Sequence, residues 1–220
     1  NIGSGIVVVP SSSLATASSV FIPPLCCGAS SSNFNQDSLF NSRLSSFQTR
    51  TTHDTQVYIE QIGNSNTIVV QQQGTPNNFT NYTGTGYSNN VNINQSSTNS
   101  TATNYTELTV NGNNNNIGLT QQSSGGTKSA LVRVSDSNNV VSLEQKDNGS
   151  HYSEITLTGS NKSVNVLQQG SGSHQAKIEL SGQPAGVSLT QTGSSQQSYS
   201  INFNCATSGG CQTIQVQQGN

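Results

Sequence analysis

The feature that most constrains the fold of this chain is an internal repeat of about 23 residues. The pattern Ile or Val, any residue, an apolar residue, any residue, Gln occurs seven times along the sequence. Successive Gln residues of the pattern are 23, 26, 24, 23, 23 and 27 residues apart. A fixed period indicates a repeat architecture in which equivalent residues stack on one another. The repeated residues are Gln72, Gln95, Gln121, Gln145, Gln168, Gln191 and Gln218.

A second apolar half-pattern precedes most of these Gln-containing halves, as in Ile155 and Leu157 or Ile178 and Leu180. Both halves alternate with period two, which is typical of short β-strands with one buried face. No stretch shows a sustained helical period. We therefore predict an all-β fold, a β-solenoid of about seven strand–turn–strand repeats of about 23 residues each, stacking into a cross-β-like fibre. The glycines expected in its tight turns, where a positive φ is needed, are Gly63, Gly86, Gly112, Gly159 and Gly182.

The repeated Gln shares a strand face with two apolar residues, so we expect its side chain to point into the solenoid. A buried amide without partners costs about 1–3 kcal/mol. Stacked at the β spacing of about 4.8 Å, each amide can donate to the next one and remove that cost. We predict such a structural ladder from the seven repeated Gln together with Gln61. The alternative is that these side chains cap strand ends at the surface.

The chain divides into an N-terminal Ser-rich arm or leader, residues 1–55, and the repeat region, residues 56–220. The arm contains β-branched runs at residues 6–9 and 20–22. It is either a flexible leader or secretion tag, or a donor strand that adds to a sheet or packs on a neighbouring subunit. Both interpretations remain open from the sequence.

Four cysteines offer possible disulfides. Cys205 and Cys211 bracket an enlarged turn within the last repeat, and a bridge between them suits an oxidising compartment. Cys26 and Cys27 are adjacent, so a bridge between them is strained relative to normal geometry. The sequence also leaves open a pairing of these two with Cys205 and Cys211.

The composition argues against several classes of protein. Charged residues make up 7% of the chain and the net charge is −2, which disfavours a nucleic-acid partner bound by charge. The apolar stretches are too short to span a bilayer. No triad, metal-ligand spacing or phosphate loop is visible, so we expect no enzyme, no cofactor and no metal. Only Glu107, Arg133 and Glu154 could be proposed as catalytic, and we expect them to be solvated outward residues.

The first repeat, from Gln61 through Gly63, Asn66, Ile68 and Val70 to Gln72, resembles the curlin repeat of the bacterial curli subunits. Two further matches run from Gly86 through Asn89 to Gln95, and from Gly112 through Asn115 to Gln121. The resemblance covers about residues 55–219. It implies a secreted, extracellular functional-amyloid fibre on the cell surface that supports biofilm and adhesion. The implied partners are the protein itself, a minor or nucleator subunit and a secretion apparatus.

The chain also departs from the curlin pattern, which usually keeps two Gln per repeat. The first Gln position is filled only by Gln61, and the Asn position is lost at Lys162 and Ala185. The competing hypothesis is a monomeric, capped β-solenoid that acts as an adhesin or another binding surface. Apolar or small residues take the first Gln position in the later repeats: Gly84, Val110, Val134, Leu157, Leu180 and Phe203.

Overall fold

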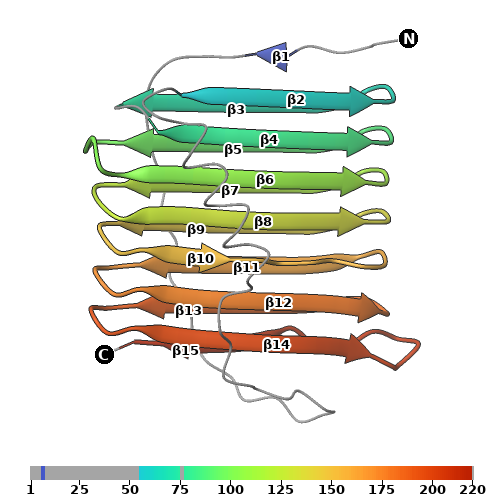
Figure 1. Ribbon diagram of the computed structural model, residues 1–220. Helices are drawn as coiled ribbons and strands as arrows, with labels where there is room; N and C mark the ends of the chain where they lie inside the picture. The colour runs from blue at the N-terminus through green and yellow to red at the C-terminus, as the bar shows by residue number, and fades with distance from the viewer. Residues whose placement is uncertain (1–5, 8–54, 75–76, 220) are drawn as a thin grey trace.

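The computed structural model describes residues 6–7, 55–74 and 77–219 of the chain. In this part the protein is all-β: two parallel sheets face each other and the chain winds between them as a β-solenoid of about seven turns (Figure 1). We call the eight-stranded sheet, with the odd-numbered strands, sheet A, and the seven-stranded sheet sheet B. This confirms the predicted all-β solenoid of about seven repeats.

The strands alternate between the two sheets in chain order. Sheet A contains β1 (Ile6–Val7), β3 (Thr67–Gly74), β5 (Asn90–Ser97), β7 (Asn116–Ser123), β9 (Val140–Asp147), β11 (Lys162–Gln169), β13 (Ala185–Thr192) and β15 (Ile214–Gln218). Sheet B contains β2 (Gln56–Ile62), β4 (Asn78–Thr85), β6 (Thr103–Asn111), β8 (Thr127–Ser135), β10 (His151–Ser153), β12 (His174–Gly182) and β14 (Gln197–Cys205).

The pairing register places equivalent residues of successive repeats directly over one another. In sheet A, for example, Val164 lies between Val141 and Val187, and Gln168 lies between Gln145 and Gln191. Longer repeats keep this register because the extra residues lie in the turns. The separation of 26 residues reflects the turn 98–102, and that of 27 residues reflects the turn 206–213.

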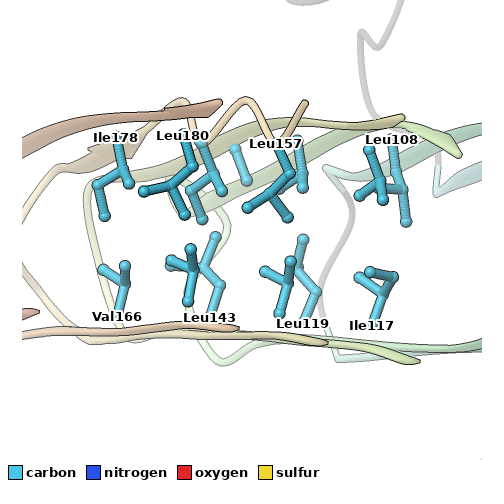
Figure 2. Close-up of a cluster of buried hydrophobic side chains, with 14 of the residues drawn as sticks. Leu108, Ile117, Leu119, Leu143, Leu157, Val166, Ile178 and Leu180 are labelled. Carbon is cyan, nitrogen blue, oxygen red and sulfur yellow. The ribbon is translucent and has the colours of Figure 1, made fainter. Parts of the chain in front are cut away.

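The core is a thin apolar layer between the sheets. Leu108, Leu157 and Leu180 point inward from sheet B, and Leu119 and Leu143 meet them from sheet A (Figure 2). All five are buried. Because each strand contributes every second residue, the apolar side chains form columns that run the length of the solenoid.

One turn of the solenoid departs from regular strand geometry. Strand β10 ends at Ser153, and Ile155 has a φ of 69°, which is unusual for a β-branched residue. The register still continues, because the amide of Leu157 donates to the carbonyl of Arg133 at 3.0 Å. Ile155 and Leu157 remain buried in the core. The distortion is therefore local, although the sequence pattern predicts a regular strand here.

Candidate functional site: polar ladders and solenoid ends

The repeated Gln side chains of sheet A form an unbroken chain of hydrogen bonds along the solenoid. In each step Nε2 of one Gln donates to Oε1 of the Gln one turn nearer the C-terminus, at 2.7–2.9 Å. The five inner members are fully buried. The ladder therefore has a direction, with its donors toward the C-terminal end. Its members, in order, are Gln72, Gln95, Gln121, Gln145, Gln168, Gln191 and Gln218.

Each ladder amide also joins sheet A to sheet B. Nε2 of Gln121 donates to the backbone carbonyl of Tyr105 at 2.9 Å, and Nε2 of Gln145 donates to that of Ser129 at 2.9 Å. Oε1 of Gln121 accepts a further hydrogen bond from Oγ1 of Thr106 at 3.0 Å. Both amide hydrogens and the carbonyl oxygen of Gln121 are therefore satisfied, which removes the cost of burying this side chain.

The two end members of the ladder each keep an unused hydrogen-bonding group, a donor at one end and an acceptor at the other. Nε2 of Gln218 donates to the carbonyl of Ser198 at 3.2 Å, and its other hydrogen has no acceptor in the described part of the chain. Nε2 of Gln72 donates to Gln95 and to the carbonyl of Gln56, but its Oε1 accepts no hydrogen bond from a described residue. The ladder thus presents a donor at its C-terminal end and an acceptor at its N-terminal end.

Gln61 does not belong to this ladder, which corrects the sequence prediction. It lies in β2 of sheet B, and its register partner in the next turn is Gly84. Its Oε1 accepts a hydrogen bond from Oη of Tyr82 at 2.7 Å, and its Nε2 donates to the carbonyl of Ile62 at 2.8 Å. The physical reason is the absence of a stacked amide above it, since Gly84 has no side chain to accept from Gln61.

A second polar ladder lies in the turns that lead from sheet B to sheet A. Nδ2 of Asn89 donates to Oδ1 of Asn66 at 3.1 Å, and Nδ2 of Asn115 donates to Oδ1 of Asn89 at 3.0 Å. Oδ1 of Asn115 then accepts from the backbone amide of Asn139, and Oδ1 of Asn139 accepts from that of Lys162, both at 2.9 Å. These Asn residues occupy equivalent positions of successive repeats, and the ladder ends at Lys162.

Lys162 replaces the amide stack with hydrogen bonds to the next turn. Its Nζ donates to the carbonyls of Gly182 and Gln183, the latter at 2.7 Å. The side chain is buried, and this burial lowers the pKa of its ammonium group. The position that departs from the pattern is therefore occupied by a cation that still satisfies the turn carbonyls.

A third polar column, which the sequence analysis missed, lines the turns that lead from sheet A to sheet B. Its members replace one another directly in the sheet B register. Most of them reach back to a carbonyl five residues earlier, as His151 does to Lys146 at 2.8 Å and His174 to Gln169 at 2.9 Å. The column consists of Asn78, Asn104, Lys128, His151, His174 and Gln197.

The centre of this column brings together three buried basic side chains, Lys128, His151 and His174. The rings of His151 and His174 stack with centroids 4.9 Å apart and an interplanar angle of 1°. Burial, with the neighbouring Lys128, lowers the pKa of His151 to about 3, and burial lowers the pKa of His174. Burial also lowers the pKa of Lys128 to about 8, against the opposing effect of Asp147. Both rings are therefore neutral at pH 7.

The proton positions on these rings follow from their partners. A carbonyl oxygen can only accept, so Nε2 of each ring carries the hydrogen. Nδ1 of His151 and Nδ1 of His174 are buried and have no hydrogen-bond partner among the described residues. The column therefore tolerates neutral imidazoles and places them beside the ammonium group of Lys128.

The expected turn glycines all have positive φ values. At Gly63 and Gly86, with φ of 119° each, a second constraint applies. A Cβ on Gly63 would lie 1.8 Å from the carbonyl oxygen of Gly86, so the stacked turns leave no room for a side chain. The other three values are 141° at Gly112, 89° at Gly159 and 79° at Gly182.

Cys205 and Cys211 form a disulfide that closes the enlarged turn of the last repeat. Cys205 ends β14 and is buried, and the amide of Cys211 donates to the carbonyl of Pro184 at 2.8 Å. The disulfide therefore closes the turn itself, and the hydrogen bond to Pro184 joins it to the preceding turn of the solenoid. Cys26 and Cys27 lie outside the described residues.

The acidic residues considered for catalysis lie on the outer face of sheet B. Oη of Tyr105 donates to Glu107 at 2.9 Å, and Oη of Tyr152 donates to Glu154 at 2.9 Å. Glu107 and Arg133 are partly exposed, but Glu154 is buried, with Nζ of Lys177 at 3.9 Å. The prediction that all three are solvated is therefore wrong for Glu154, which is buried at an outward position with Tyr152 and Lys177 as its polar neighbours.

Neither a metal site nor a spanning helix emerges from the described residues. They contain no group of three or more His, Cys, Asp or Glu that could hold a metal ion. Within the same part of the chain, no helix is long and apolar enough to cross a membrane.

The two ends of the solenoid differ in how their edge strands are paired. Among the described strands, β14 pairs only with β12, and β15 pairs only with β13, so the C-terminal turn presents two strand edges. At the other end β2 pairs only with β4 within the described residues. Strand β1 pairs with β3 over Ile6 and Val7, opposite Ile68 and Val69 (Figure 1).

Comparisons of the chain with models of known families, with curated proteins and with solved structures found no match.

Proposed function

We propose that this protein is a structural subunit of an extracellular, curli-like functional-amyloid fibre, assembled by head-to-tail stacking of β-solenoids. The observation that carries this proposal is the direction of the Gln ladder. Gln218 offers an amide hydrogen at the C-terminal end, and Gln72 offers an acceptor oxygen at the N-terminal end. A head-to-tail contact matches donor with acceptor, whereas a contact between two N-terminal ends opposes two acceptors.

The strand edges support the same geometry. The edges of β14 and β15 have backbone groups available to pair with another parallel strand, and β2 offers such an edge at the opposite end. Unpaired edges favour addition of a further strand. A stacked subunit would continue both the backbone ladder and the buried Gln ladder. In this proposal the protein is secreted, its main partner is itself, and a nucleator subunit and a secretion apparatus assist it. The fibre would support a biofilm matrix and surface adhesion.

The second candidate is a monomeric, capped β-solenoid that serves as an adhesin. One observation favours it: β1 occupies part of the edge of β3, opposite Ile68 and Val69. Stacking onto sheet A at this end, with Gln218 in contact with Gln72, requires β1 to move aside. A monomer that keeps β1 in place would instead present only its lateral faces for binding.

The fibre proposal is tested by substituting the terminal ladder residue. Gln218→Ala removes the end donor, and Gln217→Ala, an exposed neighbour on the same strand, is the matched control. One lost hydrogen bond at the growing contact is worth about 1 kcal/mol, so elongation of preformed filaments should slow about fivefold with Gln218→Ala. Equal elongation rates for the two variants would contradict the proposal. A full chain that stays monomeric at every concentration would favour the capped adhesin.

A further inference from the structure

The outer face of sheet B carries an apolar patch that the solenoid interior does not explain. Thr80 and Thr106 point inward, since their hydroxyls bond the ladder amides, so the residues before them point outward. Leu131 also points outward, because the residues on both sides of it belong to the core and point inward. The patch, which we call the sheet B outer patch, consists of Phe79, Tyr105, Leu131 and Tyr152 on four consecutive turns.

These outward side chains are nearly inaccessible to solvent. Phe79 is 6% exposed and Tyr105 is 3% exposed, whereas Tyr58, outward on the same sheet, is 57% exposed. Phe79 and Tyr105 stack with ring centroids 5.4 Å apart, but a stacked pair on an open face keeps one side toward solvent. Among the described strands, none packs on this face. The burial therefore requires a cover from outside the described strands.

We propose that the sheet B outer patch is the docking surface for this chain's own residues 8–54. The positions of the strands that residues 8–54 connect are consistent with this proposal. Strand β1 ends at Val7 beside β3, and β2 begins at Gln56, so the segment leaves and returns at the same end of the solenoid. The patch starts one turn away, at Phe79. Four turns span only about 14 Å, and an extended chain of this length reaches roughly 150 Å.

The chemistry of the segment matches the patch. Residues 8–54 include apolar and aromatic runs such as 20–22 and 39–40, which supply side chains for an apolar surface. The only basic side chains with a permanent charge in this segment are Arg43 and Arg50. The patch is bordered by the carboxylate of the partly exposed Glu107 and by that of the buried Glu154, which Lys177 approaches to 3.9 Å, and each carboxylate accepts a hydrogen bond from a tyrosine hydroxyl. Apolar burial and opposite charge thus both favour docking of this segment.

Docking of this segment does not depend on whether subunits stack into fibres. It gives the apolar runs of the segment a place on their own subunit. Such runs otherwise promote aggregation when they are exposed. The face used for docking is lateral, so it leaves the C-terminal edges of β14 and β15 accessible.

Limited trypsin digestion of the full chain tests this proposal, because trypsin can cut residues 8–54 only after Arg43 and Arg50. Mass spectrometry then follows the two cuts separately from cuts in the solenoid. The double variant Tyr105→Ser with Leu131→Ser should raise both cleavage rates about tenfold over the unchanged protein. Tyr87→Ser is the matched control, since Tyr87 is an exposed aromatic residue in a turn away from the patch. Circular dichroism confirms that each variant keeps its β structure.

Three results would overturn the proposal. The first is rapid cleavage at both arginines in the unchanged protein, as fast as in an unstructured peptide of the same sequence. The second is an equal rate in the unchanged protein and the double variant. The third is protection that disappears on roughly hundredfold dilution, because a segment supplied by a second copy would dissociate whereas an intramolecular one would not.

Discussion

Nε2 of Gln191 donates to Oε1 of Gln218 at 2.7 Å, and this last step of the ladder has the same direction as every earlier one. A ladder of identical amides could in principle reverse its direction at any turn. Here the second hydrogen of each Nε2 is fixed by a carbonyl of sheet B, as with Gln191 and Gln175 at 2.9 Å. This second bond orients each amide in the same way, so the direction is a property of the fold.

Removing one central amide should destabilise the solenoid. Gln145→Ala leaves Nε2 of Gln121 without its acceptor and the buried carbonyl of Ser129 without its donor. We expect a loss of about 2–3 kcal/mol in the free energy of unfolding, measured by urea titration. The control is Gln122→Ala, a partly exposed outward residue on the neighbouring turn, which should change stability by less than about 0.5 kcal/mol. Similar losses for both variants would show that the ladder contributes nothing specific.

The close approach of Tyr82 to Gly84 predicts that substitutions at these two positions have non-additive effects on stability. A Cβ on Gly84 would lie 2.0 Å from Oη of Tyr82 and 2.4 Å from Oε1 of Gln61. Gly84→Ala should therefore lower the free energy of unfolding by about 1–3 kcal/mol, because the added methyl group overpacks the core. In a Tyr82→Leu background the obstructing hydroxyl is gone, and the same substitution should cost clearly less. A double-mutant cycle measures the difference, and additive effects would contradict this account.

The buried His pair predicts acid sensitivity. The folded pKa of His151 is about 3 and its unfolded pKa is about 6.5, so between these values the unfolded chain binds the proton and the folded chain does not. The stabilisation is present above pH 6.5 and is lost as the pH falls toward 3. The facing groups are Lys128 and His174, with Asp147 acting on Lys128, and the two basic groups disfavour a further charge.

The size of this effect is about 5 kcal/mol at most for His151. It is measured by thermal unfolding between pH 8 and pH 3.5. His151→Asn places in the column a residue type that Asn78 and Asn104 already show to fit, and it should flatten the acid branch of the profile. Parallel pH profiles for the variant and the unchanged protein would refute the assignment.

The disulfide predicts a local effect at the C-terminal turn. Replacing both Cys205 and Cys211 by Ser removes the cross-link of a short loop. It should lower the stability of the last repeat by about 2 kcal/mol. Hydrogen exchange should quicken in β14 and β15 and stay unchanged in the central strands β6 to β9, because each turn contacts mainly its neighbours. A uniform increase along the whole solenoid would contradict this local role.

The fold could be predicted because identical residues recur in one phase of a period-two pattern. A column such as Val141, Val164 and Val187 repeats both its chemistry and its spacing, and the structure stacks it as expected. The turn-lining column around His151 escaped prediction because its chemistry changes from turn to turn. Only its position was regular: His151 and His174 each lie six residues after a ladder Gln. A search by position, without regard to residue type, could have found it.

Two other features depend on three-dimensional packing. Gln61 resembles a ladder residue in the sequence, but its register partner in the next turn of the solenoid is Gly84. The hydroxyl of Tyr82 occupies the space that a side chain at Gly84 would need. Glu154 occupies an outward position, which the alternation predicts to be solvated, yet it is buried. Period-two alternation identifies the face of a residue but does not reveal what covers that face.

The central claim, head-to-tail stacking along the Gln ladder, is tested most directly by cryo-electron microscopy of the full chain after assembly. We predict long filaments with a rung spacing of about 4.8 Å along the axis. Within them, Nε2 of Gln218 in one subunit should lie within hydrogen-bond distance of Oε1 of Gln72 in the next. Discrete particles of one solenoid each, or filaments joined by lateral faces with both ladder ends exposed, would contradict the claim.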